Sequence, residues 1–172
     1  GTVRHLIAPN SLHHVFIGDW KRAYPDASIH AAPGQVQKRR DLQFDDALSD
    51  RPAQPWGGQI DQAVLSGNRI TTEVVFFHRA SGTVLFTDLL QQFPGDWFSG
   101  WRRLVARLDL MTAPEPTVPR KFRLAFSDRK AAREALARIL AWPIEKVVMA
   151  HGTPVERDGH ALVARAFRWL TG

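Results

Sequence analysis

The chain has 172 residues, which fits one domain of ordinary size, and 44% of them are hydrophobic, which is enough for a buried core. It contains 23 Lys and Arg against 17 Asp and Glu, but the basic residues are mostly arginines scattered over predicted helices, so we expect a solvated surface and no nucleic-acid partner. Cysteine is absent, which excludes disulfides and thiolate metal sites and fits a cytoplasmic protein, and no apolar run is long enough to cross a bilayer, so no membrane is expected as a partner.

Strands and helices alternate in the first half of the chain. The pattern predicts a strand at 3–8, a helix at 12–24, a strand at 28–32, a helical turn at 35–40 and an irregular loop at 41–58. The first helix follows from apolar residues recurring with a period near 3.6, and Pro25 ends it.

The second half continues the alternation. It predicts a strand at 60–65, hairpin strands at 73–78 and 83–89, a helix at 97–110, a Pro-rich loop at 112–119, a helix from Ser127 to 142, a strand at 144–150 and a helix at 159–170. Such alternation is typical of a layered α/β fold, and we expect one domain over residues 1–172.

Three predicted strands are each followed by a residue that could bind a metal. His13 and His14 follow the first strand, Asp88 lies at the end of the second hairpin strand, and His151 follows the last strand and precedes a glycine. In α/β folds the groups that follow strand ends gather at one edge. Imidazoles and a carboxylate gathered there could hold a divalent metal, with zinc first and iron or manganese as alternatives, or no metal at all.

At this point the chain resembles the metallo-β-lactamase superfamily, and more closely an uncharacterised branch that carries Pro-Asn-x-x-His-His in place of the usual metal motif. The resemblance covers Val3 to Leu170 and implies a four-layer αβ/βα sandwich. Members of the family begin with further strands, so we expect the chain to lack its N-terminal strands. The bare sheet edge this leaves predicts a homo-oligomer, such as a dimer, or a missing segment that pairs there.

The resemblance also implies that one of the two family metal positions is lost. The family motif His-x-His-x-Asp-His falls on Pro9, Ser11, His13 and His14, and no histidine lies near Asn68, where the family has its next ligand. Pro9 cannot bind a metal, and Ser11 is a poor zinc ligand.

What remains of the family site is its second metal position. The resemblance places His13, His14, Asp88 and His151 there. A single ion in that position would activate a water molecule. It could not stabilise both the attacking and the leaving oxygen of the reaction, as a pair of metal ions does. The first functional hypothesis is therefore a one-metal hydrolase of an ester, thioester, lactone or phosphodiester, acting on a small molecule.

The alternative hypothesis is a catalytically inactive relative that serves as a binding or oligomerisation module. Asn10 or Ser11 would then cap a helix, and an ion pair of Asp88 with His151 or His14 would replace the metal. A nuclease or nucleic-acid binder ranks lowest, because the two-metal motif is absent.

A group of aromatic residues lies at the start of the helix predicted at 97–110. Trp97, Phe98 and Trp101 could line a substrate cleft, but we expect them in the core or at a dimer contact.

Overall fold

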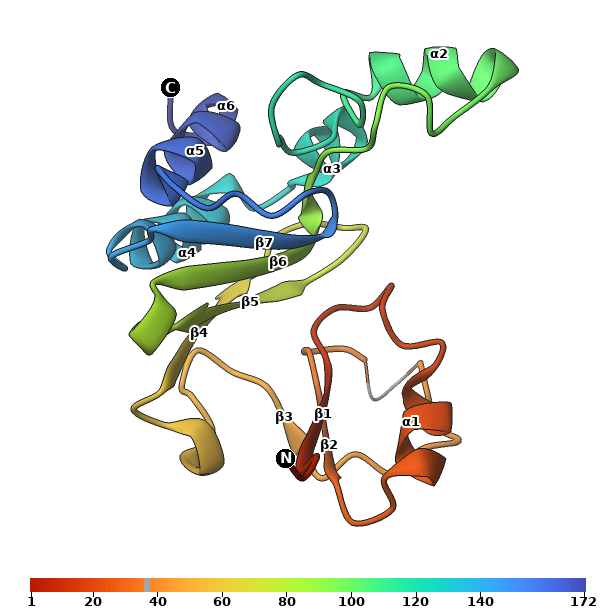
Figure 1. Cartoon of the computed structure of the whole chain (residues 1–172), viewed down its shortest axis with the longest axis vertical. Helices are drawn as coiled ribbons and strands as arrows, with labels where there is room; N and C mark the ends of the chain where they lie inside the picture. Colours follow the sequence, from red (N-terminus) through yellow and green to blue (C-terminus); the bar gives the residue numbers. More distant parts are fainter. Residues whose placement is uncertain (36–37) are drawn as a thin grey trace.

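Two β-sheets face each other, with helices on their outer sides, in the computed structural model, which describes residues 1–35 and 38–172 (Figure 1). The smaller sheet is parallel and has the order β1-β2-β3. Its strands are β1 (His5–Ala8), β2 (Ser28–Ala31) and β3 (Asp46–Ala47). Strand β1 therefore lies at an edge of this sheet.

The larger sheet has the order β4-β5-β6-β7. Its strands are β4 (Ile60–Leu65), β5 (Glu73–His78), β6 (Thr83–Gln91) and β7 (Lys146–His151). The first three form an antiparallel meander, and β7 runs parallel to β6. Because β6 and β7 are parallel neighbours, their carboxyl ends meet at the same edge of the sheet.

The helices form the outer layers. They are α1 (Ile17–Ala23), α2 (Gly100–Leu108), α3 (Arg120–Ala125), α4 (Arg129–Leu140), α5 (Gly159–Ala166) and α6 (Arg168–Thr171). Helix α1 packs on β1, and helices α4 and α5 cover the larger sheet. The main core lies under α4 and α5, where Phe77, Phe122 and Phe167 are almost fully buried. The order helix, sheet, sheet, helix is the layered sandwich expected from the sequence.

The strand predictions agree with the structure to within a few residues, but the first helix was predicted too early. Helix α1 begins at Ile17 rather than at residue 12. The side-chain oxygen of Asn10 accepts hydrogen bonds from the backbone N–H groups of Leu12 and His13, both at 2.8 Å, and holds this segment as a turn. The predicted helical turn at 35–40 includes residues 36–37, which lie outside the described residues.

Other element boundaries also differ from the prediction. Asp128, not Ser127, caps α4, because its carboxylate accepts from the N–H of Ala131. The predicted last helix is interrupted at Phe167 and continues as α6. Helix α3 was not predicted, and the loop at 41–58 contains strand β3 and a short 3-10 turn at Gln54–Trp56. Within the described residues, no helix is both long and apolar enough to span a bilayer.

Candidate metal centre

An irregular stretch of β6 creates the candidate site. Pairing between β5 and β6 reaches only Phe76 and Leu85, and the register between β6 and β7 shifts after Phe86. The backbone N–H groups that follow donate instead to the carboxylate of Glu73, at the start of β5. The distances are 2.7 Å from Thr87, 2.8 Å from Asp88 and 3.0 Å from Leu89.

Glu73 is fully buried, and the sequence did not single it out. Burial raises the pKa of its carboxyl group, and the hydrogen bonds from the backbone of residues 87–89 oppose that rise. A buried carboxylate that accepts three backbone N–H groups fixes the path of the chain through Asp88. The sequence does contain one indication of this role, since Glu73 is an acidic residue at the start of an otherwise apolar strand.

Asn10 connects the end of β1 to the same stretch of β6. Its side-chain N–H₂ lies 2.7 Å from Thr87 Oγ1, 2.7 Å from Asp88 Oδ2 and 3.4 Å from Glu73 Oε2, and the residue is fully buried. The prediction that Asn10 or Ser11 caps a helix is wrong, because helix α1 begins only at Ile17 and neither residue caps it. Asn10 does accept backbone N–H groups, but those of the turn that presents His13.

Three of the four predicted metal ligands meet at the common edge of β6 and β7. The Nδ1 atom of His13 lies 2.7 Å from Asp88 Oδ2, and the Nε2 atom of His151 lies 3.3 Å from Asp88 Oδ1. One potential ligand atom from each residue lies within 4.8 Å of the other two. Asp88 is buried, and both histidines are partly exposed. The carboxylate of the cluster is therefore buried, and its two imidazoles are accessible to solvent.

His14 lies outside this cluster. Its carbonyl oxygen accepts a hydrogen bond from Arg39, and its ring lines a cavity beside Val15 and Phe16. Among the described residues, the cluster of potential ligand atoms contains His13 and does not contain His14. The assignment of His14 as a ligand gains no support from this geometry.

Electrostatic interactions within the cluster favour a charged pair when no metal is present. Burial alone would raise the pKa of Asp88, but the His13 ring and the Asn10 amide outweigh burial and hold that pKa below its ordinary value. The contact with the Asp88 carboxylate raises the pKa of His13, and burial opposes it in part. Burial and the nearby Arg39 and Lys38 lower the pKa of His14.

The chemistry of the cluster fits a divalent metal. Two imidazoles and one carboxylate are a donor set that zinc and non-haem iron accept. The Nδ1 atom of His13 already pairs with Asp88 Oδ2 at 2.7 Å, so a metal held by both residues would replace this ion pair.

Pro9, Ser11 and Asn68, which stand where the resemblance expects other metal ligands, each contact another part of the fold. The carbonyl of Pro9 accepts the N–H of Val74, which ties β1 to β5. The hydroxyl of Ser11 contacts that of Thr71 at 3.4 Å. The amide of Asn68 donates to the carbonyl of Phe122 at 2.8 Å. All three positions therefore have partners within the fold.

Two cavities flank the cluster. His13 lines one of about 480 Å³ whose other walls are mainly apolar, including Leu12 and Phe16. His151 lines another of about 250 Å³, where the ring of Phe93 stacks on the imidazole with centroids 5.3 Å apart. Gly152 also lines this cavity, and a Cβ atom there would lie 2.6 Å from the Met149 sulfur. A small molecule could approach the cluster from either side.

The opposite pKa shifts of the two adjacent histidines give a pH prediction for the metal-free protein. We expect an NMR titration to place the pKa of His13 above 6.5 and that of His14 below it. Because the pKa of His13 is higher in the folded protein than in the unfolded chain, His13 contributes its full share to the free energy of unfolding at low pH. That contribution is lost as the pH rises through the pKa of His13 in the folded protein. The contribution of Asp88, whose pKa is lowered, is instead lost as the pH falls through its own pKa. A pKa of His13 at or below that of His14 would contradict the observed ion pair.

Comparison with known proteins places the chain in a family. A family model described as "Domain of unknown function (DUF4336)" matches residues 1–99, which is more than half of the chain. The chain belongs to this family. No curated protein matches it significantly.

Solved structures show the fold of this DUF4336 protein. A metallo-beta-lactamase from Pontibacter korlensis is 14% identical, with a TM-score of 0.60 over 99% of this chain and 70% of its own. The metallo-beta-lactamase FIM-1 from Pseudomonas aeruginosa, in its mono-zinc form, is 13% identical, with a TM-score of 0.58 over 96% and 66%. The metal-soaked Flv1 flavodiiron core from Synechocystis sp. PCC6803 is 14% identical, with a TM-score of 0.62 over 98% and 43%.

These structures share the metallo-β-lactamase fold, which confirms the expected fold class for the DUF4336 chain. At such low identity the comparison concerns the fold alone. The expectations of missing N-terminal strands, a dimer and a cytoplasmic location stay predictions.

Proposed function

We propose that this DUF4336 protein is a single-metal hydrolase whose metal is held by His13, Asp88 and His151. The observation that carries the proposal is the convergence of two imidazoles and a carboxylate within 4.8 Å at the common edge of β6 and β7. Zinc is the metal that this donor set fits best. When bound, the metal would supply Lewis-acid activation of a water molecule and of a substrate oxygen.

The remaining residues of the site have definable roles. Asp88 is oriented from two directions, by the Asn10 amide and by the Glu73 carboxylate that holds its backbone, so its two oxygens face His13 and His151. Such hydrogen bonds to a ligand fix its orientation. The apolar cavity beside His13 favours a substrate with an apolar group next to an ester, thioester, lactone or phosphodiester bond.

One observation favours the alternative of an inactive binding module. Asp88 already has charged or polar partners on both oxygens without a metal, so the cluster could persist as an ion-paired core.

Hydrolysis assays separate the two functions. We expect zinc-loaded protein to hydrolyse at least one of 4-nitrophenyl acetate, a γ-lactone and bis(4-nitrophenyl) phosphate, and to lose that activity on chelation. His151→Ala is expected to lower the rate at least about tenfold, because it removes a ligand. His14→Ala is the matched control and is expected to leave the rate nearly unchanged. Zinc-loaded protein that turns over none of the three substrates would favour the binding module.

A further inference from the structure

Helix α2 presents its apolar side to solvent. Its residues Trp101, Leu104, Val105 and Leu108 recur at the spacing i, i+3, i+4, i+7, so they form one stripe. Each of these four side chains is between 51% and 73% exposed, and Ala106 is the helix's one buried residue. An ordinary surface helix turns such a stripe toward the core.

The position of α2 leaves this stripe without a partner among the described residues. The helix stands apart from both sheets at the upper right of Figure 1. Trp97, just before it, is 66% exposed and Trp101 is 73% exposed, so of the two expected places, the core or a dimer contact, the core is wrong and the dimer contact stays a prediction. The five exposed residues Trp97, Trp101, Leu104, Val105 and Leu108 are called the α2 stripe below.

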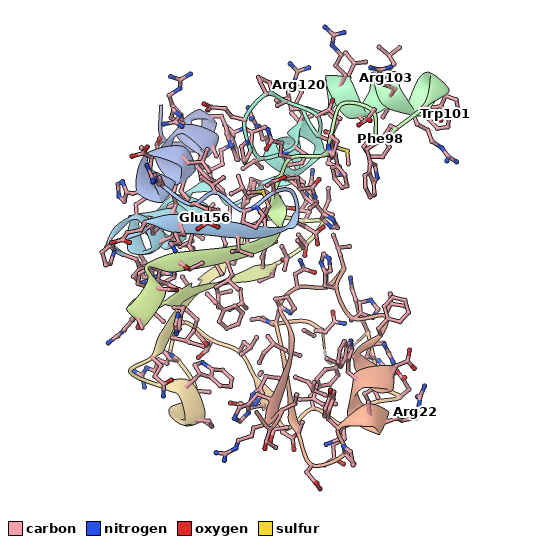
Figure 2. The ribbon with its side chains drawn as sticks, in the orientation of Figure 1. Arg22, Phe98, Trp101, Arg103, Arg120 and Glu156 are labelled. Carbon is pink, nitrogen blue, oxygen red and sulfur yellow. The ribbon has the colours of Figure 1, made fainter. Side chains whose placement is uncertain are left out.

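Arginines border the α2 stripe. Arg102, Arg103 and Arg107 lie on the same helix, all three are exposed, and the helix contains no acidic residue. At about 100° per residue, Arg102 and Arg107 flank the stripe on its two sides, and Arg103 lies on the opposite side of the helix. Figure 2 shows Trp101 at the outer end of the helix and Arg103 on its upper side. Among the described residues, no carboxylate lies within ion-pair distance of these three guanidinium groups. The surface is thus apolar in the middle and positively charged at its border.

We propose that the α2 stripe docks on the surface of an anionic membrane. A Trp- and Leu-containing stripe bordered by arginines is the pattern of helices that lie in the membrane interface. The apolar side chains enter the boundary between headgroups and acyl chains, the tryptophans suit the interface, and the arginines contact anionic headgroups. The proposal departs from the expectation of no membrane partner, which depended on the lack of a spanning segment; a helix that lies on the membrane does not need to be long or apolar enough to cross it.

Charge argues against the main rival, a second copy of the chain. Two copies that packed α2 against α2 would bring their arginine borders together, and the helix offers no acidic residue to pair with them. A nucleic acid would match the arginines but would leave the Leu and Val side chains of the stripe in contact with a charged backbone.

Vesicle sedimentation tests the proposal. We expect the chain to bind phosphatidylcholine vesicles that contain phosphatidylglycerol, more weakly at high salt, and not vesicles of phosphatidylcholine alone. Leu104→Glu is expected to weaken that binding about tenfold or more, because it removes a buried apolar contact and adds a negative charge. Leu124→Glu, on the most exposed apolar residue of α3, is the matched control and is expected to keep binding.

Three results would overturn the proposal. The first is no binding to anionic vesicles. The second is binding that Leu104→Glu leaves unchanged, since the arginines alone would then explain it. The third is a dimer in solution that Leu104→Glu dissociates while the wild-type chain does not bind vesicles, which would assign the α2 stripe to a second copy. None of these readouts depends on a bound metal or on hydrolysis.

Discussion

Replacing Asp88 by asparagine is expected to lower zinc affinity at least about a hundredfold, because it removes the one negative charge from the ligand cluster. Asp88→Asn preserves the shape of the side chain, so the effect reports on charge and coordination and not on packing. Both oxygens of Asp88 face an imidazole, and an amide nitrogen would replace one of them with a group that does not bind zinc. Competition with a chromophoric chelator at neutral pH measures the affinity.

Asp61→Asn is the matched control for this substitution. Asp61 forms a bidentate ion pair with Arg79 at the end of the hairpin and takes no part in the cluster. The zinc affinity of the Asp61→Asn protein is therefore expected to equal that of the wild type. If Asp88→Asn bound zinc as tightly as Asp61→Asn, Asp88 would not be a ligand.

The second large effect concerns stability. Glu73→Ala is expected to reduce the free energy of unfolding by about 3 kcal/mol or more, because it leaves three buried backbone N–H groups without an acceptor. Glu73→Gln retains one acceptor oxygen and nearly the same volume, so its loss is expected to be smaller. Urea denaturation of the metal-free protein measures both, which keeps the comparison independent of zinc.

Glu134→Ala supplies the control for Glu73. Glu134 is exposed on α4, where the same substitution is expected to change stability by no more than about 0.5 kcal/mol. A Glu73→Ala variant as stable as Glu134→Ala would mean that water replaces the carboxylate at no cost, and Glu73 would then not hold the irregular part of β6. If Glu73→Ala does not fold, Glu73→Gln still tests the ranking.

The sequence predicts the strands of the larger sheet because their pattern is local. The alternation in 60–65 and the hairpin around Gly82 depend only on neighbouring residues, and both are confirmed. The meeting of Asp88 and His151 follows from the same reasoning, because β6 and β7 are parallel and end at one edge. The metallo-β-lactamase fold is likewise confirmed by solved structures.

The choice between the adjacent histidines needs long-range contacts, so the sequence alone could not make it. His13 faces Asp88 because Asn10 holds the turn from one side and contacts Thr87 and Asp88 from the other. The contacts of Asn10 with Thr87 and Asp88 join residues that are 77 and 78 positions apart in the chain. The burial of Glu73 has the same origin, since it depends on where β6 loses its regular pairing with β5.

Helix α2 shows a different limit of sequence reasoning. Its apolar spacing correctly predicts a helix, but spacing gives no information about which side turns toward the core. Only the structure shows that the α2 stripe is exposed.

The central claim is that one metal binds His13, Asp88 and His151 at the common edge of β6 and β7. A crystal structure of the zinc-loaded protein with anomalous scattering at the zinc edge tests it most directly. We predict a single anomalous peak about 2.0–2.2 Å from the ring nitrogens of His13 and His151 and from the Asp88 carboxylate, with the His14 ring turned away. Zinc-loaded crystals with no peak at this cluster, or with a peak bound to His14 in place of His13, would contradict the account.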